Sequence, residues 1–495
     1  MRRSLRPVPA ILAIAAAGLA VSVAGETVGT AVSTTSPFVP SLPAVGMASG
    51  PADSRFGTGP DGSGSCQISQ LAWQGEALTD GGTLSPLAFT NPATINQSSR
   101  IAFYSKVDGS PRNQGIFVAD PHGVRTIVRG CGGGGGSGDP GTLCGDLSPI
   151  GGVFAGLFDG SLFVPDINQA GDVLFLADVF AGAAPRGLFL YRAATGQIVK
   201  VAAVGDRAPG IVRARFSSVG VASLNNTGEV VFLATTSLLP SAANIYRWKA
   251  GAVSRVVSVG DRVPGGGFFA NLGGETVGFR DGTFAPVGPA PDIDDDGRIS
   301  FRALVSGGLA GSGEFVSSAG RLEWYAKVGD ATPIGGVYQG FFAPVLGHSG
   351  EIAFYADVER SPGVFTAGWF AGRPGSWRSG LTFEDRLDGD PIERLAVSRN
   401  PMQPLDEDDR LLLWCSVLRA DGTEQEKLVV RSPDGGLTTI ASQGDATPLG
   451  GQIGRIMFFP SIVLGKATIS SDTVGAPGGV LSAHMVSDCS TVPLP

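Results

Sequence analysis

The chain has 495 residues, of which 75 are glycine and 16% are charged, and its formal net charge is −8. This composition suits many short strands joined by tight turns, and a hydrophobic content of 43% excludes a disordered chain. The acidic balance, with a pI near 5.1, excludes nonspecific nucleic-acid binding, because neutralising phosphates requires a basic face.

Residues 1–24 have the pattern of a signal peptide. Three arginines lie within the first six residues, and an apolar run follows at residues 10–23. The run is short for a membrane span, so we expect cleavage and a mature chain without a span; a retained N-terminal anchor is the alternative. Residues 25–65 are rich in Ser, Thr, Pro and Gly and are predicted to be a disordered leader.

A four-part phrase then recurs along the chain. It opens with a turn, in which Asn, Asp or Gly is followed three residues later by Gly in most units, and continues into a strand of alternating pattern. These segments are residues 96–105, 168–177, 225–234, 294–303, 347–356 and 406–415. A short strand, a strand ending in Gly-Asp, and a Pro/Gly turn with a Phe-rich strand complete the phrase. Each unit therefore holds about four strands, as one propeller blade does.

The Gly-Asp phrase gives the number of units. It falls at residues 75–76 (as Gly-Glu), 145–146, 205–206, 260–261, 329–330, 389–390 and 444–445. Six units lie between these markers. The C-terminal strands lack a Gly-Asp strand of their own, while an extra strand containing Trp73 precedes the first unit. We therefore predict an all-β, seven-bladed β-propeller, closed by pairing of the Trp73 strand with a C-terminal strand near Val480.

The cysteines support this closure. Cys66 lies just before the extra N-terminal strand and Cys489 just after the last strand, so we predict a disulfide between them in an exported protein. Cys131 and Cys144 flank a glycine-rich insertion, residues 131–144, and are predicted to form a second disulfide. Cys415 occupies a column of small residues and is interpreted as a buried thiol. The propeller is thus expected over residues 66–489, with a tail at 490–495.

The repeats resemble those of uncharacterised exported bacterial proteins with tandem NxxGxxAF motifs. The likeness covers roughly residues 70–486 and is most literal at residues 96–103, 168–175 and 225–232. The chain departs from the motif at Ser99 and Asp409, which replace the Gly, and at Ile462, which stands where Asn is expected. The resemblance implies export and a repeat fold, and it implies no catalytic residue.

The acids of the Gly-Asp phrases are one candidate site. Repetition places them at equivalent points around one face, where they would hold cations or a polycationic ligand. The alternative is that each acid caps its own turn through backbone hydrogen bonds, and their presence in every unit favours this alternative. The acids are Glu76, Asp146, Asp206, Asp261, Asp330, Asp390 and Asp445.

A second candidate is a calcium site at Asp292, Asp294 and Asp296, which precede Gly297. Alternating carboxylates open a calcium loop, because they converge on one hard cation. The bidentate Glu of such a loop is missing, and the phrase aligns with an ordinary hairpin turn at residues 166–171, so a plain turn is the alternative. Ca²⁺ is the one cofactor that the sequence suggests.

The function remains open between three hypotheses. The first is a noncatalytic binding or scaffold module, extracellular or on the cell surface, monomeric, with a polymer or protein as partner. The second is a propeller hydrolase or lyase acting on a glycan, with channel carboxylates that break the repeat; Glu384 and Asp385 are the first to inspect. The third is a calcium-dependent adhesion module. The three histidines lie in different repeats, which argues against a zinc site or a Ser-His-Asp triad.

Overall fold

A four-stranded antiparallel sheet is the repeating unit of the computed structural model. In the third unit, β12 (Phe216–Leu224), β13 (Val230–Thr236), β14 (Leu239–Lys249) and β15 (Ala252–Val257) pair in chain order. The structure describes residues 66–85, 92–132, 144–157, 163–272, 276–278, 284–286, 290–396, 404–448, 450–457 and 460–489. All of these belong to one unit, Ser54–Pro495, and the predicted signal peptide, leader and tail lie outside the described residues.

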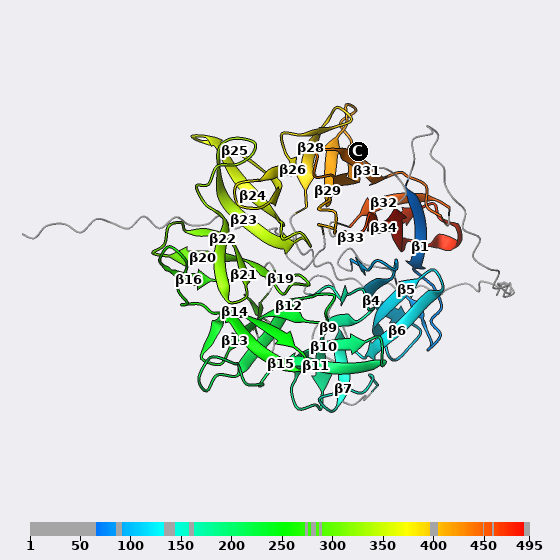
Figure 1. The fold of residues 1–495 in the computed structure, drawn as a ribbon. Helices are drawn as coiled ribbons and strands as arrows, with labels where there is room; N and C mark the ends of the chain where they lie inside the picture. Colours follow the sequence, from blue (N-terminus) through cyan, green and yellow to red (C-terminus); the bar gives the residue numbers. More distant parts are fainter. Residues whose placement is uncertain are drawn as a thin grey trace, which may run out of the picture. The chain divides into compact units, whose positions relative to one another are not determined.

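Six further sheets follow the same plan, and we number the seven blades in chain order from the first complete one (Figure 1). Blade 1 contains β2 (Thr83–Leu84), β3 (Thr94–Ile95), β4 (Ile101–Asp108), β5 (Gln114–Asp120) and β6 (Gly123–Gly130). Blade 2 contains β7 (Val153–Leu157), β8 (Asp166–Ile167), β9 (Val173–Phe180), β10 (Arg186–Arg192) and β11 (Gln197–Ala203). Blade 4 contains β16 (Phe268–Asn271), β19 (Asp292–Ile293), β20 (Ile299–Ser306), β21 (Ser312–Ser318) and β22 (Arg321–Lys327), with an extra hairpin of β17 (Thr276–Gly278) and β18 (Phe284–Pro286).

The remaining blades complete the ring. Blade 5 contains β23 (Val337–Leu346), β24 (Ile352–Ser361), β25 (Val364–Gly372) and β26 (Arg378–Thr382). Blade 6 contains β27 (Arg386–Leu387), β28 (Asp390–Leu395), β29 (Leu411–Leu418), β30 (Glu424–Arg431) and β31 (Leu437–Ser442). Blade 7 contains β32 (Gln452–Ile456), β33 (Ile462–Val463), β34 (Lys466–Val474), β35 (Ser482–Asp488) and β1 (Gln67–Trp73).

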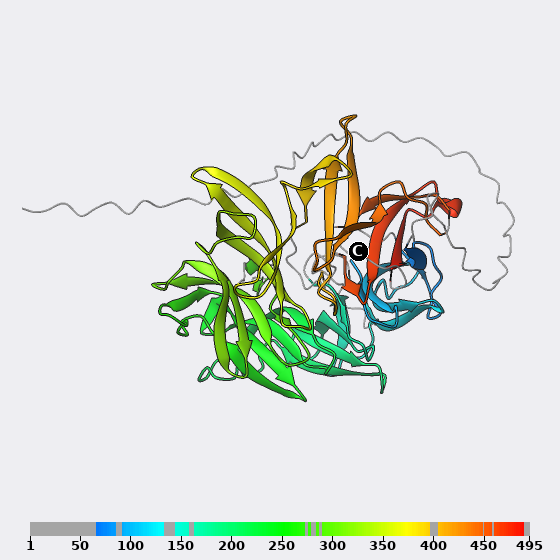
Figure 2. The same cartoon turned by 45° about the horizontal axis from the view of Figure 1, so that its top comes forward.

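Blade 7 is assembled from both ends of the described chain, and this confirms the predicted closure. β1 pairs antiparallel with β35, with Gln67 opposite Asp488 and Trp73 opposite Ala483. The partner strand begins at Ser482, two residues after Val480, which ends a short 3₁₀ turn at Pro477–Gly479. Figure 2 shows the N-terminal strand beside the C-terminal strands. The pairing removes the free edge that an open sheet would present.

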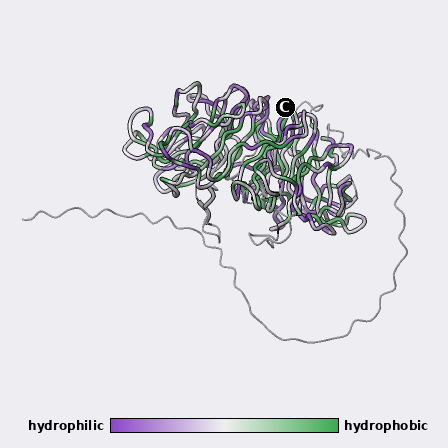
Figure 3. Tube along the Cα trace, turned by 90° about the horizontal axis from the view of Figure 1, so that it is seen from below, coloured by the Kyte–Doolittle hydropathy of each residue, from purple (hydrophilic) through white to green (hydrophobic). Residues whose placement is uncertain are grey.

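The hydrophobic core is divided into layers, one between each pair of adjacent blades. Between blades 2 and 3, Phe232 packs within 5.9 Å of Phe216 and 5.7 Å of Tyr246, measured between ring centroids, and all three rings are buried. Residues of β13 point alternately to this layer and to the layer shared with blade 4, where Leu233 lies. Because both faces of the strand are covered, β13 is apolar throughout. Figure 3 shows the same apolar interior along the trace.

The connections define two faces of the ring. The turn from each first strand to the second strand, such as residues 225–229, lies on one face, which we call the Asn-turn face. The link from the fourth strand to the next blade, such as residues 204–207, lies on the other, because each first strand runs from one face to the other; we call it the Gly-Asp face. No helix of the described residues is long and apolar enough to cross a membrane.

Candidate functional site: two faces of the ring

The motif Asn links neighbouring blades. In blade 3, the Asn225 side-chain carbonyl accepts a hydrogen bond from the Glu229 amide at 2.8 Å, which closes its own turn. The same side chain donates through Nδ2 to the carbonyl of Asp294 in blade 4, also at 2.8 Å. Asn168 reaches Asn225 in this way at 3.2 Å. The amide is required because only a side chain with both a donor and an acceptor can make these two bonds.

Two structural requirements explain the Gly of the repeated turn. Gly228, Gly297 and Gly350 have φ values of 77°, 76° and 88°, in the left-handed region that favours glycine. A Cβ at Gly297 would also lie 2.5 Å from the guanidinium of Arg247 in the preceding blade. Ser99 and Asp409, which replace the Gly, keep the left-handed conformation at φ 58° and 56°.

The residues that directly follow the motif position meet around the ring axis. We call them the collar, and they are Gln97, Gln169, Asn226, Asp295, His348 and Glu407. In blades 2 to 4 the side-chain oxygen of each collar residue accepts the backbone amide of the previous collar residue; the Asp295 carboxylate, for instance, accepts from Asn226 at 2.7 Å. The Glu407 carboxylate accepts from the Gln97 side chain at 3.0 Å and from the Leu464 amide at 2.9 Å.

The collar contains the one acid–imidazole–acid arrangement of the described residues. His348 places Nδ1 3.7 Å from Asp295 and Nε2 3.9 Å from Glu407, and its side chain is 40% exposed. Behind it lies a hollow of about 40 Å³, lined in part by Asp292, Leu346 and Leu405. A hollow of this size has room for a water molecule and not for a sugar ring. The carboxylates are also occupied by donors of the protein itself, as Glu407 is by Gln97 and Leu464, so the collar offers a substrate little free charge.

Sequence reasoning missed the collar. It singled out the constant positions of the repeat, whereas the collar is the neighbouring position, at which residue type varies from blade to blade. That variation next to a constant Asn or Asp was the available signal. His348 was dismissed because no other histidine lies near it in sequence, and the fold brings two carboxylates to it instead.

The three aspartates of the predicted calcium loop do not converge in the structure. Asp292 is partly buried and accepts from the Ser223 hydroxyl at 2.6 Å and from the Leu346 amide at 2.8 Å. Asp294 is held by Arg298, which also lies 3.3 Å from the exposed carboxylate of Asp296. Within the described residues no group of three or more His, Cys, Asp or Glu side chains is placed to hold a metal ion. Calcium binding at this turn stays an untested prediction.

The acids of the Gly-Asp phrases cap turns. Asp206, Asp261 and Asp330 each accept the amide three residues earlier, at 2.9, 2.8 and 3.0 Å. Basic side chains neutralise them, as Lys200 does for Asp206 at 2.9 Å. The capping interpretation therefore holds, and a free acidic ring does not form. Glu76 is capped in the same manner, and burial raises its pKa to about 7.

In blade 6 the predicted marker was wrong. Asp385 accepts from the Thr382 amide at 2.8 Å and so occupies the capping position, while Asp390 begins β28. The sequence misled because Gly389-Asp390 matches the phrase literally, whereas the true cap is preceded by Glu384. Glu384 and Asp385 are accordingly part of the repeat rather than extra channel acids.

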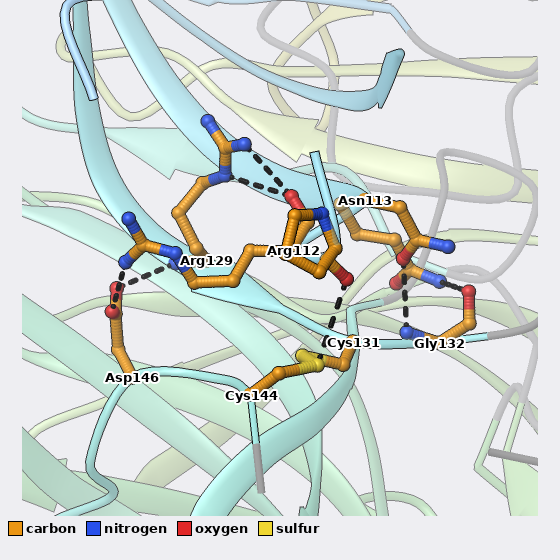
Figure 4. Close-up of a disulfide and its surroundings, with 9 residues drawn as sticks. Arg112, Asn113, Arg129, Cys131, Gly132, Cys144 and Asp146 are labelled. Atoms are coloured by element: carbon orange, nitrogen blue, oxygen red, sulfur yellow. Dashed lines mark hydrogen bonds and ion pairs between the residues drawn. A yellow bond between two sulfur atoms is a disulfide. The ribbon is translucent and has the colours of Figure 1, made fainter. Parts of the chain in front are cut away.

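The second disulfide closes the base of the glycine-rich insertion. Cys131 and Cys144 are bonded, as are Cys66 and Cys489, and residues 133–143 lie outside the described residues. Figure 4 shows the polar contacts around this base, where the Asp146 carboxylate receives the Arg112 guanidinium at 2.9 Å and the Arg129 amide at 2.8 Å. The loop is thereby fixed at its root.

The remaining sulfur and imidazole groups are structural. Cys415 is a buried free thiol, and burial raises its pKa to about 12, which makes it a poor nucleophile. His484 occupies a strand position that is apolar in most blades, bonds Ser470 at 2.7 Å, and lies 4.7 Å from the Phe103 ring. Burial lowers its pKa to about 3, so it is neutral in the folded protein. His122 lies in a turn with an exposed side chain.

The Gly-Asp face carries the exposed apolar side chains. Among the described residues, every exposed large hydrophobic side chain except Phe342 and Leu464 lies in a loop of this face or in the half of a strand that is nearer to it. The most exposed are Val212 at 84%, Leu147 at 82% and Leu309 at 67%. The others are Phe180, Leu238, Phe268, Leu304, Val364, Phe365, Phe383, Leu418, Val474 and Leu481. Exposed apolar side chains are thus more numerous on this face than on the Asn-turn face.

Comparison with known proteins places the chain in a family without assigned activity. Residues 60–371 match the model of a family of unknown function, DUF7453. The chain belongs to this family. No curated protein matches the sequence significantly.

Solved propellers resemble this DUF7453 member only distantly. An oligogalacturonate lyase from Vibrio parahaemolyticus is 10% identical, with 86% of this chain and 98% of that chain covered and a TM-score of 0.45. A puromycin-hydrolyzing peptidase from Mycobacterium tuberculosis is 12% identical, with 86% and 57% covered and a TM-score of 0.44. The β-propeller domain of the Trilobed protease from Pyrococcus furiosus is 10% identical, with 77% and 96% covered and a TM-score of 0.35. Such distant likenesses carry no inference about activity.

Proposed function

We propose that this DUF7453 member is an exported, noncatalytic binding module that contacts a partner protein through its Gly-Asp face. The observation that carries the proposal is the gathering of exposed Leu, Val and Phe side chains on that face. The predicted signal peptide at residues 1–24 and the two disulfides support export, since disulfides persist in oxidising compartments.

The chemistry of the face favours a protein over a glycan. The exposed side chains are aliphatic or phenyl groups without hydrogen-bonding atoms, whereas a glycan presents hydroxyl groups that need polar partners. The acids of the same face are largely paired, as Asp261 is with Arg255 at 3.2 Å, so an apolar protein surface meets little uncompensated charge.

The first and last described residues lie on the side opposite this face. β1 runs from Gln67 to Trp73 and then enters a turn of the Gly-Asp face, so Cys66 and its partner Cys489 lie at the opposite end of their strands. A leader or anchor attached before Cys66 therefore starts from the Asn-turn side. A partner can approach the apolar side chains without displacing the closure of the ring.

The enzymatic alternative rests on the collar. Asp295, His348 and Glu407 offer acid and base groups at the channel, and a glycan hydrolase or lyase would use such a pair. The small hollow and the occupied carboxylates argue against this alternative. A calcium-dependent adhesion module is the third hypothesis, and a melting temperature unchanged by a chelator would remove it.

The test is a binding screen with matched variants. The mature chain, residues 25–495, is screened against arrays of defined extracellular proteins and of glycans. The face variant combines Val212→Ser, Leu309→Ser and Phe365→Ser, and the control is His348→Ala in the collar. We expect binding to a protein that weakens at least tenfold in the face variant and is unchanged in the control. Binding only to glycans, or equal binding by the face variant, would contradict the proposal.

A further inference from the structure

A second hollow lies on the Asn-turn face and is lined by residues of blades 2, 3 and 4. Its volume is about 350 Å³, at the lower end of the range for small-molecule sites. Of the residues that line it, only Asp295 also lines the hollow behind the collar. Its charged side chains are Arg192, Glu229, Arg247, Lys249, Asp295 and Asp296.

Arg247 breaks the repeat at this hollow. It lies opposite Val231 in the paired strand, and the equivalent position is apolar in the six other blades. The equivalent residues are Val118, Leu190, Val316, Ala371, Val430 and Val486. The guanidinium fits because the next turn has Gly297, where a Cβ would lie 2.5 Å from it. A charge in an apolar column costs free energy, so its presence points to a use that the other blades lack.

Blade 3 gives the hollow an excess of positive charge. Arg247 and Lys249 both pair with the one carboxylate of Glu229, whose side chain is 7% exposed. In blade 2 the equivalent acid, Asp172, pairs with Arg192 at 2.7 Å. Blade 3 therefore holds one cation more than its acid balances. Lys249 is the accessible member of the pair, because 65% of its side chain is exposed.

The turn of blade 4 gives the same hollow an excess of negative charge. Asp294 and Asp296 share the guanidinium of Arg298, and Asp295 lies 3.7 Å from His348. Three acids thus face at most two cations, so the turn keeps negative charge whether or not the imidazole is protonated. Asp296 is the accessible acid, with 77% of its side chain exposed.

We propose that this hollow binds a small zwitterion, a molecule that carries both an ammonium group and a carboxylate. The carboxylate lies against Arg247 and Lys249, and the ammonium group lies against Asp295 and Asp296. A ligand with both charges balances both excesses, whereas an anion alone is repelled by the acids and a cation alone by the two basic side chains. The site lies away from the Gly-Asp face, so it does not rest on the proposed function.

Isothermal titration calorimetry of the intact chain tests the proposal. The probes are free glycine, β-alanine and γ-aminobutyrate, in which the two charges are progressively further apart. An alkylamine and an alkanoate of the same chain length are the one-charge controls for each probe. We expect at least one zwitterion to bind with a Kd in the millimolar range or tighter, and its two controls to bind at least about tenfold more weakly. Binding by no zwitterion, or equal binding by a control, would overturn the proposal.

Three variants then locate the binding. Lys249→Gln and Asp296→Asn each remove one exposed charge, so both are expected to fold and to weaken binding at least about fivefold. The matched control is Lys200→Gln, because Lys200 pairs with Asp206 on the Gly-Asp face, and it is expected to bind as the unmodified protein does. Full binding by both hollow variants, or an equal loss in the control, would place the ligand elsewhere and contradict the site.

Discussion

Gly297 shows how one residue type is fixed by two independent requirements. Its backbone is left-handed, and the Arg247 guanidinium of the preceding blade occupies the space of a Cβ while it pairs with Glu229. Gly307 is equally left-handed at φ 70°, but it has open space around it. Comparing the two glycines therefore distinguishes the effect of backbone strain from the effect of a contact between blades.

We predict that Gly297→Ala lowers the free energy of unfolding more than Gly307→Ala does. The shared left-handed strain costs about 1 kcal/mol in each variant, and displacement of Arg247 adds about 1 kcal/mol at Gly297. Urea denaturation followed by circular dichroism measures both. Equal losses would show that the arginine contact contributes nothing.

Glu314 is a buried acid at a position that is apolar in most blades. It lies opposite Arg302 in the paired strand, neither carboxylate oxygen has a hydrogen-bond partner, and burial raises its pKa to about 8. The folded state therefore holds a proton that the unfolded state releases above about pH 4.5, and stability falls as the pH rises toward 8.

We predict that Glu314→Gln becomes more favourable relative to the unmodified protein as the pH rises from 5 to 8. The difference in unfolding free energy should shift toward the variant by at least about 1 and at most about 4 kcal/mol. Thermal melts of both proteins across this range provide the test. A difference that stays constant with pH would mean that Glu314 is not protonated in the fold.

At the scale of elements, the structure and the repeated Gly-Asp phrase assign the turn cap of blade 6 to different residues. Asp385 bonds both the amide and the hydroxyl of Thr382, whereas Asp390 makes no such cap. We predict that Asp385→Ala costs about 1 kcal/mol of unfolding free energy, while Asp390→Ala stays within about 0.5 kcal/mol. Chemical denaturation measures both. A larger loss of unfolding free energy in Asp390→Ala than in Asp385→Ala would show that Asp390 is the cap after all.

The repeat made the blades predictable, whereas the collar could not be predicted because its residue types vary from blade to blade. Asn225 and Gly228 recur because each turn needs the same bonds and the same backbone, and the recurring Gly-Asp phrases gave the number of blades. The collar escaped detection because His348 and Glu407 are 59 positions apart and meet only when seven turns converge on one axis. Val212 and Leu309 were not predicted for a different reason. Their exposure makes them surface residues rather than core residues, and the periodicity of the sequence does not predict exposure in loops.

At the scale of the whole molecule, ring closure depends on the first and last described strands. The Cys66–Cys489 disulfide joins residues 423 positions apart, and the Cys131–Cys144 disulfide joins residues 13 positions apart. In the chain-entropy model the longer loop stabilises more. We predict that Cys66→Ser/Cys489→Ser lowers the unfolding free energy by up to about 5 kcal/mol, and Cys131→Ser/Cys144→Ser by about 3 kcal/mol or less. Thermal melts compare the two double variants, and a larger effect of the shorter loop would argue against closure by the chain ends.

The central claim is that both ends of the chain build one blade, and peptide mapping of the unreduced protein tests it most directly. Digestion followed by mass spectrometry should yield the Cys66 peptide joined to the Cys489 peptide, with Cys415 modified by alkylating reagents only after unfolding. A free Cys66, or Cys66 joined to Cys131 or Cys144, would contradict the closed seven-bladed ring.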